Sequence, residues 1–132
     1  MDDVELGAAF DGIPVHSAMG VSMTRTAGGI TINGELGELW ARGQGLTQAH
    51  GGSIAILLDS ATTFVIMIET GRGWATVDLR VDYLRPVALG PIEVAAEVVR
   101  AGRAIGRARA ELRDRDGALC ATAIATLAAE QA

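Results

Sequence analysis

Lysine is absent from this 132-residue sequence, and cysteine, proline and aromatic residues are scarce. The single cysteine, Cys120, excludes an internal disulfide and is typical of a reducing compartment. The net charge is −5 although all eleven basic residues are arginine, so nucleic acid is not an expected partner. The sequence contains no metal-ligand spacing and no phosphate-cradling glycine loop, so we expect neither a metal nor another cofactor.

A secretory signal and a membrane span are also not expected. The first ten residues, MDDVELGAAF, are acidic and contain no basic segment followed by an apolar run. The most apolar stretch, residues 53–68, is shorter than the ~20 residues of a membrane-spanning helix, and it contains Asp59. We therefore expect a cytoplasmic protein without a membrane partner. At this length and with 49% hydrophobic residues, it can bury a core without disulfides.

The chain divides into an N-terminal leader, residues 1–17, and a single domain, residues 18–132. The leader shows no clear periodicity, and because its His16 has no evident partner, we interpret this histidine as structural. Residues 19–43 predict a hairpin of two strands. We place its turn at Gly28-Gly29, because adjacent glycines adopt positive φ freely, and a bulge at Asn33-Gly34.

Residues 51–69 predict a helix that is apolar on every side, which is typical of a buried helix. The segments after it alternate between apolar and other side chains, as half-buried strands do. In TVDLRVDYL we expect alternate residues to share one face: Val77, Leu79, Val81 and Tyr83. Turn residues, among them Asp116-Gly117, separate four such strands.

The predicted order is therefore two strands, one helix and four strands, which defines an α+β fold. Short connections after the helix favour antiparallel pairing, and one sheet and one helix must then bury each other. Alanine and glycine on the inner strand faces let the sheet curl around the helix. Because such a sheet exposes its edge strands, we expect a homodimer.

A buried helix introduced by His50-Gly51-Gly52, with an acid nine positions after the histidine, resembles the hotdog-fold acyl-CoA thioesterases. The most similar groups are the phenylacetate-pathway and Arthrobacter-type 4-hydroxybenzoyl-CoA thioesterases. The segment TVDLRVDYLRPVALGPIEVAAEVVRAGR resembles their third and fourth strands, and DRDGALCATAIATL resembles their closing hairpin. The resemblance implies a long curved antiparallel β-sheet wrapped around one central α-helix, and a homodimer or a tetramer of two dimers that hydrolyses acyl-CoA.

The resemblance also implies roles for individual residues. Gly51 matches the glycine whose N–H polarises the thioester carbonyl, and Asp59 matches the acid that acts as nucleophile or general base. Gln44 matches a residue that orients the attacking water or the carboxylate, and Thr63 one that can contact the reaction centre. His50 is either a base or, as we favour, the residue that orients the turn. The acid here is aspartate, whereas the Arthrobacter type has glutamate. The resemblance therefore does not determine whether the acyl group of the substrate is aromatic or of medium length.

Helix geometry constrains how these residues cooperate. Gly51 and Asp59 are eight residues apart, about 12 Å along the axis, so both reach one carbonyl group only if they come from different chains. We therefore expect the site at a dimer interface. Gly51 and Gly52 lack side chains that would keep a substrate from the positive end of the helix. Arg85 and Arg103 are the candidates for binding the CoA phosphates.

Other interpretations of the same residues are possible. Asp59 could be a structural acid, although burying an unpaired carboxylate is costly. Hydratases and dehydratases of acyl thioesters pair a histidine with an acid in a different arrangement, and a purely structural assembly unit leaves Asp59 unexplained. The principal alternative is a non-catalytic module that binds or senses acyl-CoA and leaves the ester intact.

Overall fold

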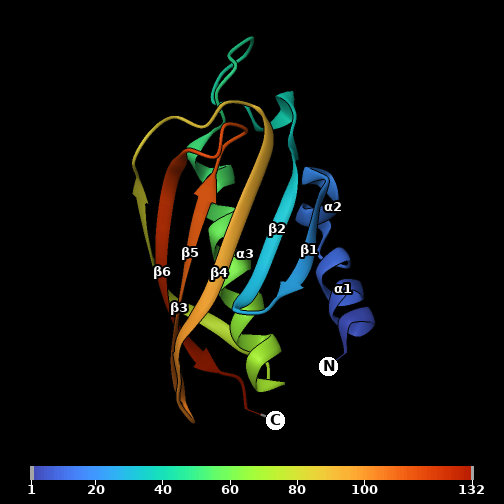
Figure 1. Ribbon diagram of the computed structural model, residues 1–132, viewed down its shortest axis with the longest axis vertical. Helices are drawn as coiled ribbons and strands as arrows, with labels where there is room; N and C mark the ends of the chain where they lie inside the picture. The colour runs from blue at the N-terminus through green and yellow to red at the C-terminus, as the bar shows by residue number, and fades with distance from the viewer. Residues whose placement is uncertain (1, 132) are drawn as a thin grey trace.

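A computed structural model describes residues 2–131, and it consists of one antiparallel sheet curled around one long helix (Figure 1). The six strands lie in the order β1-β2-β4-β5-β6-β3. Their bounds are β1 (Val21–Thr26), β2 (Gly29–Leu36), β3 (Trp74–Tyr83), β4 (Gly90–Ala101), β5 (Ile105–Arg113) and β6 (Leu119–Ala129). The helices are α1 (Asp3–Asp11), α2 (Pro14–Met19), the 3-10 helix η1 (Glu38–Trp40) and α3 (Gly51–Thr70). The α+β class and the wrapped central helix are confirmed.

The central helix, α3, is apolar on most of its surface but is not buried on every side. It packs on the sheet, and its ring-bearing residue Phe64 lies edge-on to Phe10 of α1. Its buried apolar residues are Ile54, Leu57, Leu58, Ala61, Phe64, Val65 and Ile66. Four residues at helical spacing are only half-buried and form what we call the open stripe: Ile56, Asp59, Thr63 and Met67. The expectation of a helix buried all round is wrong for this stripe, because the sheet of one chain does not cover it.

Small residues on the inner face bring the sheet close to α3, as the sequence predicts. Several alanines of β4, β5 and β6 are buried there, and so is Gly106. A Cβ atom at Gly106 would overlap the Ile66 side chain and lie 3.1 Å from Trp74 Cζ3. A larger residue at this position would therefore push β5 away from the helix.

The first hairpin differs from the prediction at its turn. The turn consists of Ala27 and Gly28, and Gly29 is already the first paired residue of β2. Neither glycine has a positive φ. Gly29 is instead needed for close approach, because a Cβ atom there would overlap the backbone of Ala96 on β4.

The predicted bulge at Asn33-Gly34 is also wrong. Both residues pair in regular register with β1 and with β4. Gly34 lies against β1, where a Cβ atom would be 2.7 Å from Val21 Cγ1. Here the glycine marks two strands that pack closely and not an extra residue.

A bulge does occur in β3, at Val77. Thr76 pairs with Leu127 of β6 before the register shift, and Leu79 pairs with Ala125 after it. Both β6 partners are buried on the inner face, so Thr76 and Leu79 both face α3. Val77 has no partner and is 64% exposed. The strict alternation predicted from residue 77 onward therefore fails at Val77, because the extra residue changes the phase of the strand.

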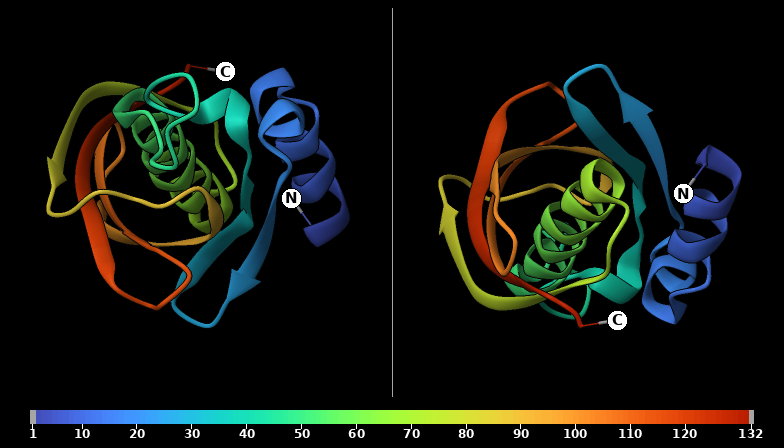
Figure 2. Two further views of the ribbon diagram at one scale, coloured as in Figure 1. Left: turned by 90° about the horizontal axis from the view of Figure 1, so that it is seen from above. Right: turned by 90° about the horizontal axis from the view of Figure 1, so that it is seen from below.

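Residues 3–19 fold as two short helices beside β1 and β2 (Figure 2). A capping box between Asp2 and Glu5 begins α1. Leu6, Phe10, His16 and Met19 are buried and join the core. The boundary that we expected after residue 17 falls inside α2, and the terminal residues 1 and 132 of the predicted ranges lie outside the described residues.

By length and a mean hydropathy of 1.7, α3 also meets the criteria for a membrane-spanning helix. Half of it is buried inside the protein, and it contacts five of the six strands. A core helix wrapped by a sheet has the same length and hydropathy, so these two properties do not indicate a membrane.

Candidate active site

The first turn of α3 presents one free amide group. Gly52 N–H donates to Nδ1 of His50 over 2.9 Å, and Ser53 N–H donates to the His50 carbonyl over 3.0 Å. Gly51 N–H makes no hydrogen bond to another group within residues 2–131. His50 therefore caps and orients this turn, with its ring proton on Nε2, and leaves a free donor at the positive end of the helix.

The two glycines of this turn differ in whether the fold requires glycine at their positions. A Cβ atom at Gly52 would lie 3.0 Å from Nδ1 of His50, so glycine is needed there for the cap. A Cβ atom at Gly51 would meet only the ring of Tyr83, at an ordinary 3.5 Å. The fold does not require glycine at 51, and its absence of a side chain leaves the free N–H accessible. A ligand contact at Gly52 stays a prediction.

A cleft of about 520 Å³ opens beside Gly51. Tyr83 lines it and donates its hydroxyl proton to the Gly51 carbonyl over 2.7 Å. Arg42 and Arg85 also line it, and neither forms an ion pair with a carboxylate among the described residues. Two unpaired guanidinium groups and a helix N-terminus make this cleft favourable for an anion.

The Asp59 carboxylate lies on the open stripe, two turns further along α3. Its Oδ1 accepts a hydrogen bond from Thr76 Oγ1 over 2.7 Å. The Thr63 hydroxyl lies 3.2 Å from the same Thr76 oxygen, and it donates there because the Thr76 proton is directed to Asp59. Oδ2 makes no hydrogen bond within residues 2–131, so one oxygen is held and the other is available. The structure thus brings Asp59 and Thr63 together at Thr76.

Sequence reasoning missed Thr76, Tyr83 and Arg42 as site residues. A strict alternation places Thr76 on the outer face of β3, and only the bulge at Val77 turns it toward Asp59. Tyr83 is correctly placed on the inner face, but its bond to the helix start depends on the end of β3 reaching α3. Arg42 carries no sequence signal, because it lies in an irregular loop.

Two of the predicted site residues, Gln44 and Arg103, lie apart from Gly51 and Asp59 within a single chain. Gln44 is exposed in the loop between η1 and α3 and lines a separate hollow of about 390 Å³ with Glu38 and Arg42. Arg103 lies in the β4–β5 connection, where its carbonyl accepts a hydrogen bond from Arg72 Nη1 over 2.8 Å. Arg72 follows the C-terminal end of α3, so Arg103 does not share the cleft of Gly51 and Arg85 in the same chain.

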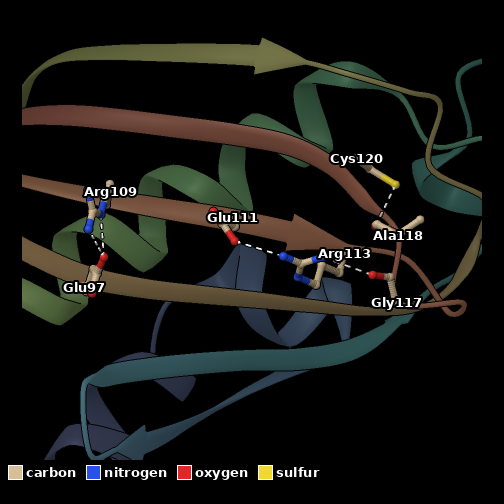
Figure 3. A network of polar contacts seen from close by, with 7 residues as sticks. All are labelled: Glu97, Arg109, Glu111, Arg113, Gly117, Ala118 and Cys120. Atoms are coloured by element: carbon tan, nitrogen blue, oxygen red, sulfur yellow. Dashed lines mark hydrogen bonds and ion pairs between the residues drawn. The ribbon is translucent and has the colours of Figure 1, made fainter.

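Other arginines of the sheet are engaged on its outer face (Figure 3). Arg109 pairs with Glu97 at 2.5 Å. Arg113 pairs with Glu111 at 3.2 Å and also donates to the Gly117 carbonyl over 3.1 Å. Exposed ion pairs of this kind contribute little to stability. They hold Arg109 and Arg113 on the outer face of the sheet, away from the Gly51 cleft.

Cys120 is fully buried in β6, and its thiol donates to the Ala118 carbonyl over 3.3 Å. Burial raises the pKa of this thiol above its ordinary value, and the nearby Asp114 carboxylate raises it further. Within residues 2–131, no three histidine, cysteine, aspartate or glutamate side chains gather closely enough to hold a metal ion.

Comparisons with known proteins agree with this architecture. A family model described as the thioesterase superfamily matches residues 47–121. The medium/long-chain acyl-CoA thioesterase YigI of Salmonella typhimurium is 35% identical over an alignment of 92 positions, which covers 58% of this chain and 59% of that protein. The chain spans about half the length of the curated relatives that it matches.

Solved structures match over nearly the whole chain. A thioesterase family protein from Silicibacter pomeroyi superimposes with a TM-score of 0.85 and 26% identity, and the match covers 97% of both chains. The BH2602 protein from Bacillus halodurans, solved with CoA, has a TM-score of 0.79 over 89% of this chain and 79% of that chain. At 19% identity this second likeness concerns the fold alone.

Proposed function

Because the chain belongs to the thioesterase superfamily, we propose that it hydrolyses an acyl-CoA thioester to a free acid and coenzyme A. The similarity to the medium/long-chain acyl-CoA thioesterase YigI supports this choice of substrate. The observation that carries the proposal is the Asp59 carboxylate. It is a half-buried acid with no arginine partner among the described residues, and one of its oxygens is held by Thr76.

In the proposed reaction, Gly51 N–H donates to the thioester oxygen as negative charge develops there. Oδ2 of Asp59 acts in one of two ways that the geometry allows equally. It takes a proton from water as the water attacks the carbonyl carbon, and the C–S bond breaks to release the CoA thiolate. Alternatively, the carboxylate attacks that carbon itself, the thiolate leaves, and water opens the mixed anhydride. In both routes Thr76 holds the carboxylate, and the Thr63 hydroxyl donates in turn to Thr76.

We propose that each active site combines Gly51 of one subunit with Asp59 of the other in a homodimer. The two residues are eight positions apart on one rigid helix, about 12 Å, which is too far to contact one carbonyl group. The open stripe and the edge strand β3 offer the surface for pairing, since Val77, Tyr83 and Leu84 are each more than half exposed there. A second copy on this face would cover an apolar edge that is otherwise open to solvent.

Arg85, with Arg42 beside it, is proposed to bind CoA phosphates at the mouth of the Gly51 cleft. We also propose that Gln44 orients the attacking water and that Arg103 is a second contact for the CoA phosphates. Both roles require a site that is completed by the partner subunit. Two dimers forming a tetramer and a cytoplasmic location are also proposed. The buried, unpaired Cys120 supports the location.

A panel of aromatic and medium-chain acyl-CoAs tests the proposal through release of free thiol. We expect hydrolysis of at least one class, with a lower KM for CoA thioesters than for the phosphate-free N-acetylcysteamine thioesters of the same acids. Binding of acyl-CoA without thiol release would favour the sensing module instead. An equal KM for both carriers would contradict the role of the two arginines.

A further inference from the structure

His16 is a fully buried histidine that the proposed reaction does not use. Its Nδ1 lies 2.8 Å from the Phe10 carbonyl, and its Nε2 lies 2.7 Å from Ser60 Oγ. Because a carbonyl can only accept, Nδ1 donates a proton to Phe10, and Nε2 and the Ser60 hydroxyl share the second hydrogen bond. The ring also stacks on Phe10 with centroids 3.9 Å apart. A buried histidine with both ring nitrogens hydrogen-bonded therefore joins the N-terminal helices to α3.

Ser60 directly follows Asp59, so two successive residues of α3 are held from two sides. Thr76 of β3 holds Asp59, and His16 of α2 holds Ser60. Adjacent helical residues differ by about 100° in direction, so the two hydrogen bonds enclose one sector of the helix surface. By helical spacing, the remaining residues of the open stripe fall inside that sector. The uncovered face of α3 is thus bounded by one polar contact on each side.

These two contacts oppose rotation of α3 about its own axis. Side chains end about 5–6 Å from a helix axis, so a rotation of about 10° moves the Asp59 carboxylate by about 1 Å. A misplacement of about 1 Å can cost a hundredfold in rate. If the packing of α3 on the sheet limits the rotation to a fraction of this, the expected loss is about tenfold.

We propose that the His16–Ser60 hydrogen bond is a positioning contact that sets the direction of the Asp59 carboxylate toward the substrate carbonyl. The inference rests on the proposed thioesterase function. In this proposal α1 and α2 influence the reaction by holding His16, although no residue of either helix lines the Gly51 cleft. His16 and Ser60 act through Asp59 and touch no reacting atom.

The test compares Ser60→Ala with Ser60→Thr, which keeps the hydroxyl, at a temperature where circular dichroism shows all variants folded. For Ser60→Ala we expect kcat to fall about tenfold with KM within about twofold of the wild type, because misalignment affects the chemical step. Ser60→Thr should recover most of kcat. Thr62→Val is the matched control, since the Thr62 hydroxyl donates only to carbonyls of α3 itself, and it should turn over like the wild type.

His16→Asn adds a double-mutant cycle. If the two side chains act through one hydrogen bond, the double variant should lose no more kcat than Ser60→Ala alone. If the double variant loses the product of the two single-variant losses in kcat, the proposed pair is overturned. If His16→Asn does not fold, the Ser60 variants alone decide the test. Wild-type kcat in Ser60→Ala overturns the positioning role while the thioesterase stands. A wild type that cleaves no acyl-CoA overturns both proposals.

Discussion

Replacement of Gly51 by proline would remove the amide hydrogen that the proposed mechanism directs at the thioester oxygen. The structure accommodates this change. Gly51 is the first residue of α3, where proline is favoured, and His50 before it has φ −64° and ψ 134°, a conformation compatible with a following proline. The lost N–H has no partner within residues 2–131, and a Cβ atom would lie 3.5 Å from the Tyr83 ring.

We therefore expect Gly51→Pro to keep the wild-type melting temperature and to lose about a hundred- to a thousandfold in kcat, the usual effect of deleting one oxyanion donor. Gly51→Ala is the matched control, because it adds a Cβ atom and keeps the N–H. It should retain at least ten times the activity of the proline variant. Steady-state kinetics with the best acyl-CoA would measure the difference, and undiminished turnover by a folded Gly51→Pro would refute the role of this amide.

Mixing two inactive variants tests whether the site is shared. A heterodimer of Gly51→Pro and Asp59→Asn contains one site with both wild-type groups and one with neither. Random reassortment of equal amounts makes half of the dimers mixed, so about a quarter of the wild-type activity should return. If activity does not rise above that of the two parents after confirmed subunit exchange, the two groups do not act across an interface.

Three further results are expected. Thr76→Val removes the hydroxyl that holds the proposed catalytic carboxylate, and kcat should fall about tenfold while the free energy of unfolding falls by about 1 kcal/mol; unchanged kcat would contradict the positioning role. Gly106→Ala should lower the free energy of unfolding by about 1–3 kcal/mol by crowding Ile66, whereas Gly28→Ala, with open space around its Cβ, should leave it unchanged in urea titrations. Because burial raises the pKa of the Cys120 thiol, the native protein should react slowly with Ellman's reagent at pH 8, and its stability should decline as pH rises above the ordinary thiol range; fast labelling of the folded protein would contradict this.

Periodicity was sufficient to predict the order of the strands and of α3 from residue 19 onward, but not the short 3-10 helix η1. The apolar run of α3, its glycine stop and the alternating strands each have a strong local cause, and they agree with the observed sheet. The errors occur where glycine serves close packing. Gly29 and Gly34 lie in regular strands against neighbouring backbones, and nothing in the local sequence distinguishes this use from a turn or a bulge.

Apart from Arg85, which lines the Gly51 cleft, the candidate site could be predicted only in the part that lies along α3. Gly51, Asp59 and Thr63 share one helix, so their spacing alone defines their geometry. Thr76 reaches Asp59 because of a bulge that depends on pairing between β3 and β6, a contact between residues far apart in the chain. The partner of His16 is likewise 44 positions away, which explains why the histidine had no evident role in the sequence.

The most direct test of the catalytic role of Asp59 is thiol release from acyl-CoA by the wild type and by Asp59→Asn, with substrate binding measured separately by calorimetry. We predict that the wild type releases coenzyme A, and that the variant binds the same substrate but loses about a hundredfold or more in turnover. Equal turnover by the two proteins would contradict the role of Asp59 and the mechanism built on it.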